Sequence, residues 1–98
     1  MTRRRVVVTG IGAITACASG DGRDARGLRR ALTEPRSAIR RITRFDPTPF
    51  RSRIAAEIDD FDPLDHMDAK RARRLDRFSQ LAVAASRQAL VDASLPTC

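Results

Sequence analysis

The strongest constraint on the fold is a short apolar run near the N-terminus. Three valines at residues 6–8 follow an arginine cluster at residues 3–5, and Gly10 and Gly12 interrupt the apolar residues that come next. A continuous apolar run bounded by glycine is typical of a β-strand buried on both faces, as in a parallel sheet. We therefore predict a central strand near residues 5–9. Such a strand needs neighbours on both sides, and 98 residues supply few of them.

The charge of the chain is strongly positive and unevenly distributed. Its net charge is +7, and 18 of its 19 basic residues are arginine. Residues 1–44 contain 11 basic and 3 acidic side chains (net +8), residues 45–68 contain 2 and 7 (net −5), and residues 69–98 contain 6 and 2 (net +4). This pattern predicts internal ion pairs as much as an external polyanionic partner. No run approaches the roughly 20 apolar residues of a membrane span, and the N-terminus lacks a secretory apolar core, so we expect a cytoplasmic protein.

Apolar residues at helical spacing predict a first helix near residues 24–33. Asp21 or Asp24 can cap its start, and Pro35 forces it to end. Residues 39–50 are expected to be irregular. A short strand is predicted near residues 53–58, with three side chains on one face: Ile54, Ala56 and Ile58.

The C-terminal third has the clearest helical pattern, near residues 69–93. Apolar side chains recur there every three or four residues, at Leu75, Phe78, Ala82, Ala85 and Ala89. Asp68 is a candidate cap for a first segment, and Asp76 for a second segment after a break. Between the short strand and this helix, residues 59–63 form an acidic loop.

The two glycines after the valine run invite comparison with a dinucleotide-binding turn. That motif needs a third glycine, and Thr15 occupies its place. It also needs a helix that opens at the glycines, whereas the first predicted helix begins near Asp24. We therefore do not favour a nucleotide site.

Nucleic-acid binding is a second hypothesis, because the sequence pI is about 11.3. The four phenylalanines are scattered, so they form no platform for stacking bases, and the acidic middle repels phosphate. A small basic interaction module that binds an acidic protein or nucleic acid nevertheless stays open as the alternative function.

Groups able to perform nucleophilic or metal chemistry are few, since the chain contains two cysteines and one histidine. We expect Cys17, among small residues, to be a packed thiol, and His66 to lie on the surface. Cys98 is the last residue, where no helix dipole activates it. Three such groups form neither a disulfide framework nor a zinc site. We predict no metal and no cofactor.

Three blocks of sequence, in order, resemble one protein family. VVVTGIGAIT begins at residue 6, SAIRRITRFDPTPFRSRIAAEIDDFDP at residue 37 and KRARRLDRFSQLAVAASRQALVDASL at residue 70. They resemble the N-terminal portion of β-ketoacyl-acyl-carrier-protein synthases, both the condensing enzymes of fatty acid synthesis and the ketosynthases of dissociated polyketide synthases. The segment FDPTPFRS at residues 45–52 leans toward the polyketide (type II) enzymes.

The resemblance implies an α/β thiolase-like fold, of which residues 1–98 are an incomplete N-terminal part, and a homodimer or ketosynthase heterodimer at full length. It also implies acyltransferase chemistry: a decarboxylative Claisen condensation that uses one Cys and two His. In the family all three lie beyond the matching segment, and neither Cys17, Cys98 nor His66 matches them. We therefore predict no catalytic residue here and no activity of this chain alone.

One site does follow from the resemblance. In related condensing enzymes, basic residues at the start of the C-terminal helix contact the acidic acyl carrier protein, and Lys70, Arg73 and Arg74 match those positions. Residues three and four positions apart lie on one side of a helix, so the spacing agrees with this role. Such a cluster accelerates association with an acidic partner and is weakened by salt. The alternative is a solvated helix start without a partner.

Overall fold

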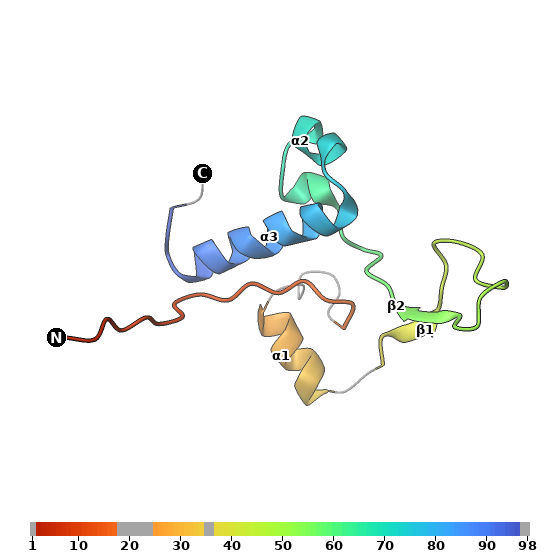
Figure 1. Ribbon diagram of the computed structural model, residues 1–98, viewed down its shortest axis with the longest axis horizontal. Helices are drawn as coiled ribbons and strands as arrows, with labels where there is room; N and C mark the ends of the chain where they lie inside the picture. The colour runs from red at the N-terminus through yellow and green to blue at the C-terminus, as the bar shows by residue number, and fades with distance from the viewer. Residues whose placement is uncertain (1, 18–24, 35–36, 97–98) are drawn as a thin grey trace. The chain divides into compact units, whose positions relative to one another are not determined.

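The computed structural model describes residues 2–17, 25–34 and 37–96 (Figure 1). Its elements follow one another as α1 (Ala25–Thr33), β1 (Ile39–Arg41), β2 (Ile54–Ala56), the short helix η2 (Pro63–Asp65), α2 (Ala69–Arg74) and α3 (Arg77–Asp92). They form two compact units. The hairpin unit spans Ile14–Asp62, and the α3 unit combines Met1–Ala13 with Pro63–Cys98. Among the helices that the structure describes, none combines the length and apolar character of a membrane span.

The hairpin unit contains an antiparallel pair of three-residue strands, β1 and β2, with Arg40 opposite Ala55 at its centre. β2 confirms the strand predicted near residues 53–58. Its Ile54 and Ala56 side chains are exposed, whereas Ala55 on the opposite face is half-buried.

The strand β1 corrects the prediction that residues 39–50 are all irregular. Its sequence, Ile-Arg-Arg, has no alternation of apolar and polar side chains that could indicate a strand. These residues form a strand because they pair with β2. A further hydrogen bond from the Ile42 N–H to the Arg53 carbonyl (2.9 Å) extends the hydrogen-bonded pairing of the two strands.

The helix α1 confirms the first predicted helix, near residues 24–33. Its last turn is closed at the Arg30 carbonyl, which accepts bonds from the Glu34 N–H and from the Thr33 hydroxyl, each 2.9 Å long. Three residues predicted to start or stop this helix lie outside the described part of the chain: Asp21, Asp24 and Pro35.

The helices α2 and α3 occupy the stretch near residues 69–93, and they confirm the predicted break within it. Asp68 caps α2, because its Oδ1 accepts a hydrogen bond of 2.7 Å from the Arg71 N–H. Asp76 takes the corresponding position before α3 without a side-chain bond.

The break is held by the side chain of Gln80, from the first turns of α3. Leu75 has an extended backbone that ends α2. The Gln80 amide donates to the Ala72 carbonyl (2.8 Å) and to the Leu75 carbonyl (3.3 Å). Carbonyls at the end of a helix lack a donor within the helix, and the Gln80 side chain supplies one here.

The buried side of α3 differs from the predicted apolar stripe. Ala84 is fully buried, whereas Phe78 is 72% exposed and Ala82 is exposed. The spacing predicted the helix correctly, but no described segment covers its residues 78 and 82. The spacing of apolar residues identifies one apolar side of a helix, but the segment that packs against the helix determines which of those residues are buried. The other buried residues in the described part of the α3 unit are Met67 and Ala72.

The N-terminal segment runs along α3 without forming a strand, which corrects the prediction near residues 5–9. No described segment pairs with its backbone, and a strand exists only through such pairing. Val6 and Val8 are 95% and 83% exposed. The segment is instead tied to α3 by side chains, because the Ile11 N–H donates to Asp92 Oδ2 (2.9 Å) and the Ala13 N–H to Gln88 Oε1 (3.0 Å).

Candidate functional site

The two glycines lie against the C-terminal half of α3 and not at a helix N-terminus. A Cβ added at Gly10 meets the Ala89 carbonyl oxygen at 2.2 Å, and one added at Gly12 meets the Ala85 carbonyl oxygen at 1.9 Å. The glycines therefore allow a close approach between the N-terminal segment and a helix. This arrangement lacks the helix N-terminus that a phosphate cradle requires.

Among the residues that the structure describes, the groups with nucleophilic or basic chemistry form no site of their own. Cys17 is a free, exposed thiol, so the prediction that it is packed was wrong. His66 is half-buried, not fully on the surface, and its carbonyl accepts a hydrogen bond from Arg87 Nη1. Cys98 lies outside the described residues. The described part of the chain contains no group of three or more side chains arranged to hold a metal ion.

An acidic side chain is held tightly within the hairpin unit. Glu57, whose side chain is 5% exposed, accepts hydrogen bonds from the Thr43 hydroxyl (2.7 Å), the Thr43 N–H (2.9 Å) and the Arg44 N–H (3.2 Å). The bond from the Thr43 hydroxyl is the main cause that lowers the pKa of the Glu57 carboxyl. Arg40 adds a contact at 3.5 Å and also pairs with Asp59.

These contacts confirm the internal ion pairing that the charge pattern predicts. They also show that the Glu57 carboxylate ties the loop before β2 to the segment after it. Three donors and an arginine surround the carboxylate, so the cluster is built for structure and not for proton transfer.

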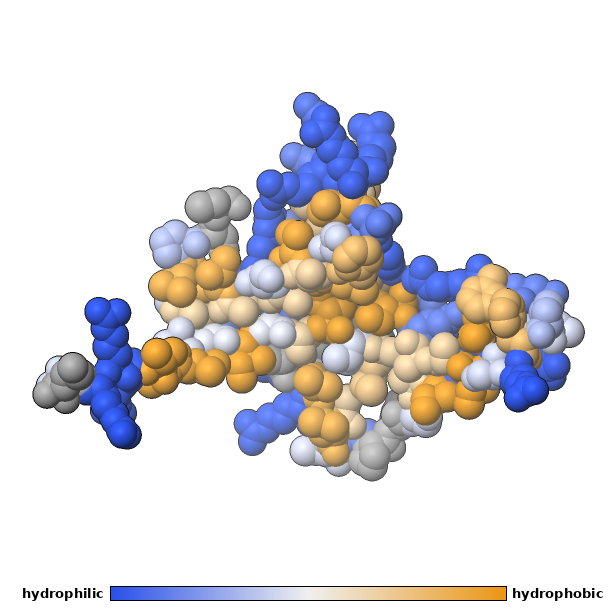
Figure 2. Space-filling view, viewed as in Figure 1, coloured by the Kyte–Doolittle hydropathy of each residue, from blue (hydrophilic) through white to orange (hydrophobic). Residues whose placement is uncertain are grey.

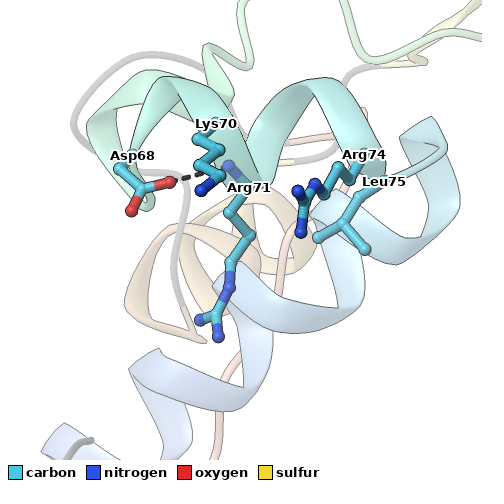
Figure 3. A pocket seen from close by; sticks show the side chains of 5 residues that line it. All are labelled: Asp68, Lys70, Arg71, Arg74 and Leu75. Carbon is cyan, nitrogen blue, oxygen red and sulfur yellow. Dashed lines mark hydrogen bonds between the residues drawn. The ribbon is translucent and has the colours of Figure 1, made fainter.

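The cationic cluster lies on α2, where hydrophilic side chains gather in Figure 2. Lys70, Arg73 and Arg74 are all exposed, as docking requires. Lys70 and Arg74 line an open pocket of about 340 Å³, but Arg73 does not (Figure 3). The Arg73 Nε donates instead to the Ala69 carbonyl of its own helix at 3.3 Å.

Arg71 and Leu75 also line this pocket, and neither was among the docking residues predicted from the sequence. Arg71 is exposed and Leu75 is half-buried, and Asp68 completes the lining. The signal that could have found Arg71 is its spacing, because it precedes Arg74 by three residues and shares that side of the helix.

A second depression lies between the N-terminal segment and α3. Its volume is about 400 Å³, and its lining is mostly apolar: Val8, Thr9, Gly10, Ser86, Ala89, Leu90, Ala93 and Leu95. No charged side chain lines it, so it offers no groups for acid–base chemistry.

Comparison with known proteins places these features in a family. The sequence model described as "Beta-ketoacyl synthase, N-terminal domain" matches residues 3–97. Over 95 residues, the chain is 43% identical to the 3-oxoacyl-[acyl-carrier-protein] synthase 2 of Synechocystis sp. and 40% identical to that of Coxiella burnetii. Each alignment covers 97% of this chain and 22% of the relative.

A solved structure gives the same result for the fold. The ishigamide ketosynthase/chain length factor matches with a TM-score of 0.77 and 38% identity, over 97% of this chain and 23% of that one. The match confirms the predicted α/β, thiolase-like fold. The chain thus spans less than a quarter of the length of the proteins it matches, and it belongs to the β-ketoacyl synthase N-terminal domain family.

Proposed function

We propose that this chain supplies the N-terminal portion of a 3-oxoacyl-acyl-carrier-protein synthase-like acyltransferase. The family match over residues 3–97 is the observation on which the proposal depends. The reaction proposed for the full-length protein is a decarboxylative Claisen condensation in fatty acid or polyketide biosynthesis. The full-length protein would act as a homodimer or as a ketosynthase heterodimer.

The chain does not contain the complete catalytic set for this reaction. The condensation needs one Cys to hold the acyl thioester and two His to assist decarboxylation, and the sequence contains a single His. We therefore expect the 98-residue chain alone to form no product from acyl and malonyl carrier proteins.

The contribution we propose is part of the docking face for the acyl carrier protein, through Lys70, Arg73 and Arg74. Their exposure on α2 supports it. Exposed charges gain little energy at contact but steer an acidic partner toward the surface. The interaction should therefore weaken steeply as salt is added.

A binding measurement tests the docking face. The probe is the acyl carrier protein of Synechocystis, the organism of one relative. Replacing Lys70, Arg73 and Arg74 together by Ala should weaken binding about tenfold at low salt. Unchanged binding would show that α2 is only a solvated helix start. Tighter binding of the unmodified chain to duplex DNA would favour the alternative, a small basic interaction module.

A chimera tests the proposed place of the chain in the enzyme. Residues 3–97 replace the matching segment of the Synechocystis synthase, and the condensation rate is measured. We expect a soluble protein that retains activity, because the two segments are 43% identical over 95 residues and share one family. A soluble chimera without activity would contradict the proposal. The unmodified synthase and a synthase lacking the segment are the controls.

A further inference from the structure

We propose that Arg71 completes the docking surface on α2, in the position that family resemblance gives to Arg73. The surface then consists of Lys70, Arg71 and Arg74 around the pocket, with Leu75 at its edge. This inference rests on the proposed function, because it takes an acidic protein as the partner. It changes which side chains contact that partner.

The pocket geometry supports Arg71 directly. In Figure 3 the side chains of Arg71 and Arg74 extend from the same side of α2, and Lys70 lies beside Arg71. Lys70 and Arg74 are four residues apart, so their Cα atoms are about 6 Å apart along the helix axis. Arg71 is one residue from Lys70 and adds a third cation to the same pocket.

Arg73 differs from these three residues in its contacts. It is absent from the pocket lining, and its Nε is engaged by the Ala69 carbonyl at 3.3 Å. A partner seated in the pocket therefore meets three cations without needing Arg73. Family positions alone do not show this difference, because they identify a residue by alignment and not by the direction of its side chain.

The one carboxylate in the pocket does not neutralise these cations by direct pairing. Asp68 Oδ1 accepts the Arg71 backbone N–H at 2.7 Å, which is a helix-capping bond. Within the described residues, none of the three cationic groups forms an ion pair with a side chain. Their charges are therefore available to a partner, and the cap fixes the backbone from which Arg71 extends.

The partner that fits is an acidic protein surface of defined pattern. Neighbouring carboxylates on such a surface can pair with Lys70 and Arg74 together, and Arg71 can bind a carboxylate through two parallel hydrogen bonds. An apolar side chain beside these carboxylates would contact Leu75, which is half-buried at the pocket edge. A pocket of about 340 Å³ admits such side chains.

Two charge-matched variants separate Arg71 from Arg73. Arg71→Ala and Arg73→Ala each remove one positive charge from α2, so they change the net charge equally. Alanine favours helix, and Arg71→Ala keeps the backbone N–H that Asp68 caps, so both variants should fold. Binding to the Synechocystis acyl carrier protein is measured at low salt, for the 98-residue chain and for the chimera described above.

We expect Arg71→Ala to weaken binding about threefold to fivefold, and Arg73→Ala less than about twofold. If only Arg73→Ala weakens binding to the acyl carrier protein, or if both variants weaken it equally, the inference is overturned and the proposed function stands. No loss with either variant, combined with no loss in the triple variant at Lys70, Arg73 and Arg74, would overturn both.

Discussion

Replacing Gly12 by Ala should separate the N-terminal segment from α3. The added Cβ lies 1.9 Å from the Ala85 carbonyl oxygen and 2.8 Å from the Ala89 N, whereas ordinary contact begins at 3.4 Å. Both obstacles are helix backbone atoms, which cannot rotate aside as a flexible side chain can. The segment must therefore withdraw by about 1.5 Å to restore ordinary contact.

Withdrawal on that scale breaks the bond between the Ala13 N–H and Gln88 Oε1, now 3.0 Å long, because it moves beyond hydrogen-bond range. Overpacking costs about 1–3 kcal/mol, and a lost hydrogen bond costs about 1 kcal/mol. We expect the local contact to weaken by about 2–4 kcal/mol, and the lower value already corresponds to about 30-fold faster hydrogen exchange at the Ala13 amide.

Amide exchange followed by NMR measures this effect. Thr9→Ala is the control, because it alters an exposed side chain of the same segment and should change exchange little. If Gly12→Ala leaves the Ala13 exchange rate within about threefold of the unmodified chain, the segment does not pack on α3 as described.

Three further predictions follow from the two units. Asp68→Ala should destabilise α2 by about 1 kcal/mol, seen as faster amide exchange in its first turn, while Asp76→Ala, which removes no side-chain cap bond, should have little effect on α3. Ala84→Leu should destabilise the α3 unit by about 1–3 kcal/mol in exchange measurements because Ala84 is fully buried, whereas Ala82→Leu at an exposed position should not; equal effects would contradict the burial pattern. Since hydrogen bonds lower the pKa of Glu57, its stabilisation of the hairpin unit should be complete above about pH 4.3 and should be lost as pH falls through the lower folded pKa; Glu57→Gln should flatten that acid dependence in an NMR titration.

Local patterns predicted the helices well. Apolar spacing located α1, and the aspartates at 68 and 76 located the starts of α2 and α3, because capping and periodicity act within a few residues. The family resemblance also followed from sequence blocks alone, and the comparisons confirm it.

Features that depend on distant partners could not be predicted in the same way. The valine run reads as a strand, but strand formation requires backbone neighbours, and the described residues supply none. β1 has two arginines in three residues and is a strand only because β2 pairs with it. Arg71 was missed although its three-residue spacing from Arg74 is visible in the sequence. Spacing alone does not show that Arg71 lines the pocket while Arg73 donates to the Ala69 carbonyl of the same helix.

The exposed valines also bear on how this chain behaves in concentrated solution. An apolar segment with unpaired backbone is a template on which other copies can assemble edge to edge. Three exposed arginines at residues 3–5 immediately precede it, and their mutual repulsion opposes the stacking of identical segments. The range of that repulsion shrinks from about 10 Å at 0.1 M salt to about 3 Å at 1 M. Added salt therefore weakens the arginine repulsion that keeps the valine segments of different copies apart. We expect the chain to resist aggregation best at low ionic strength.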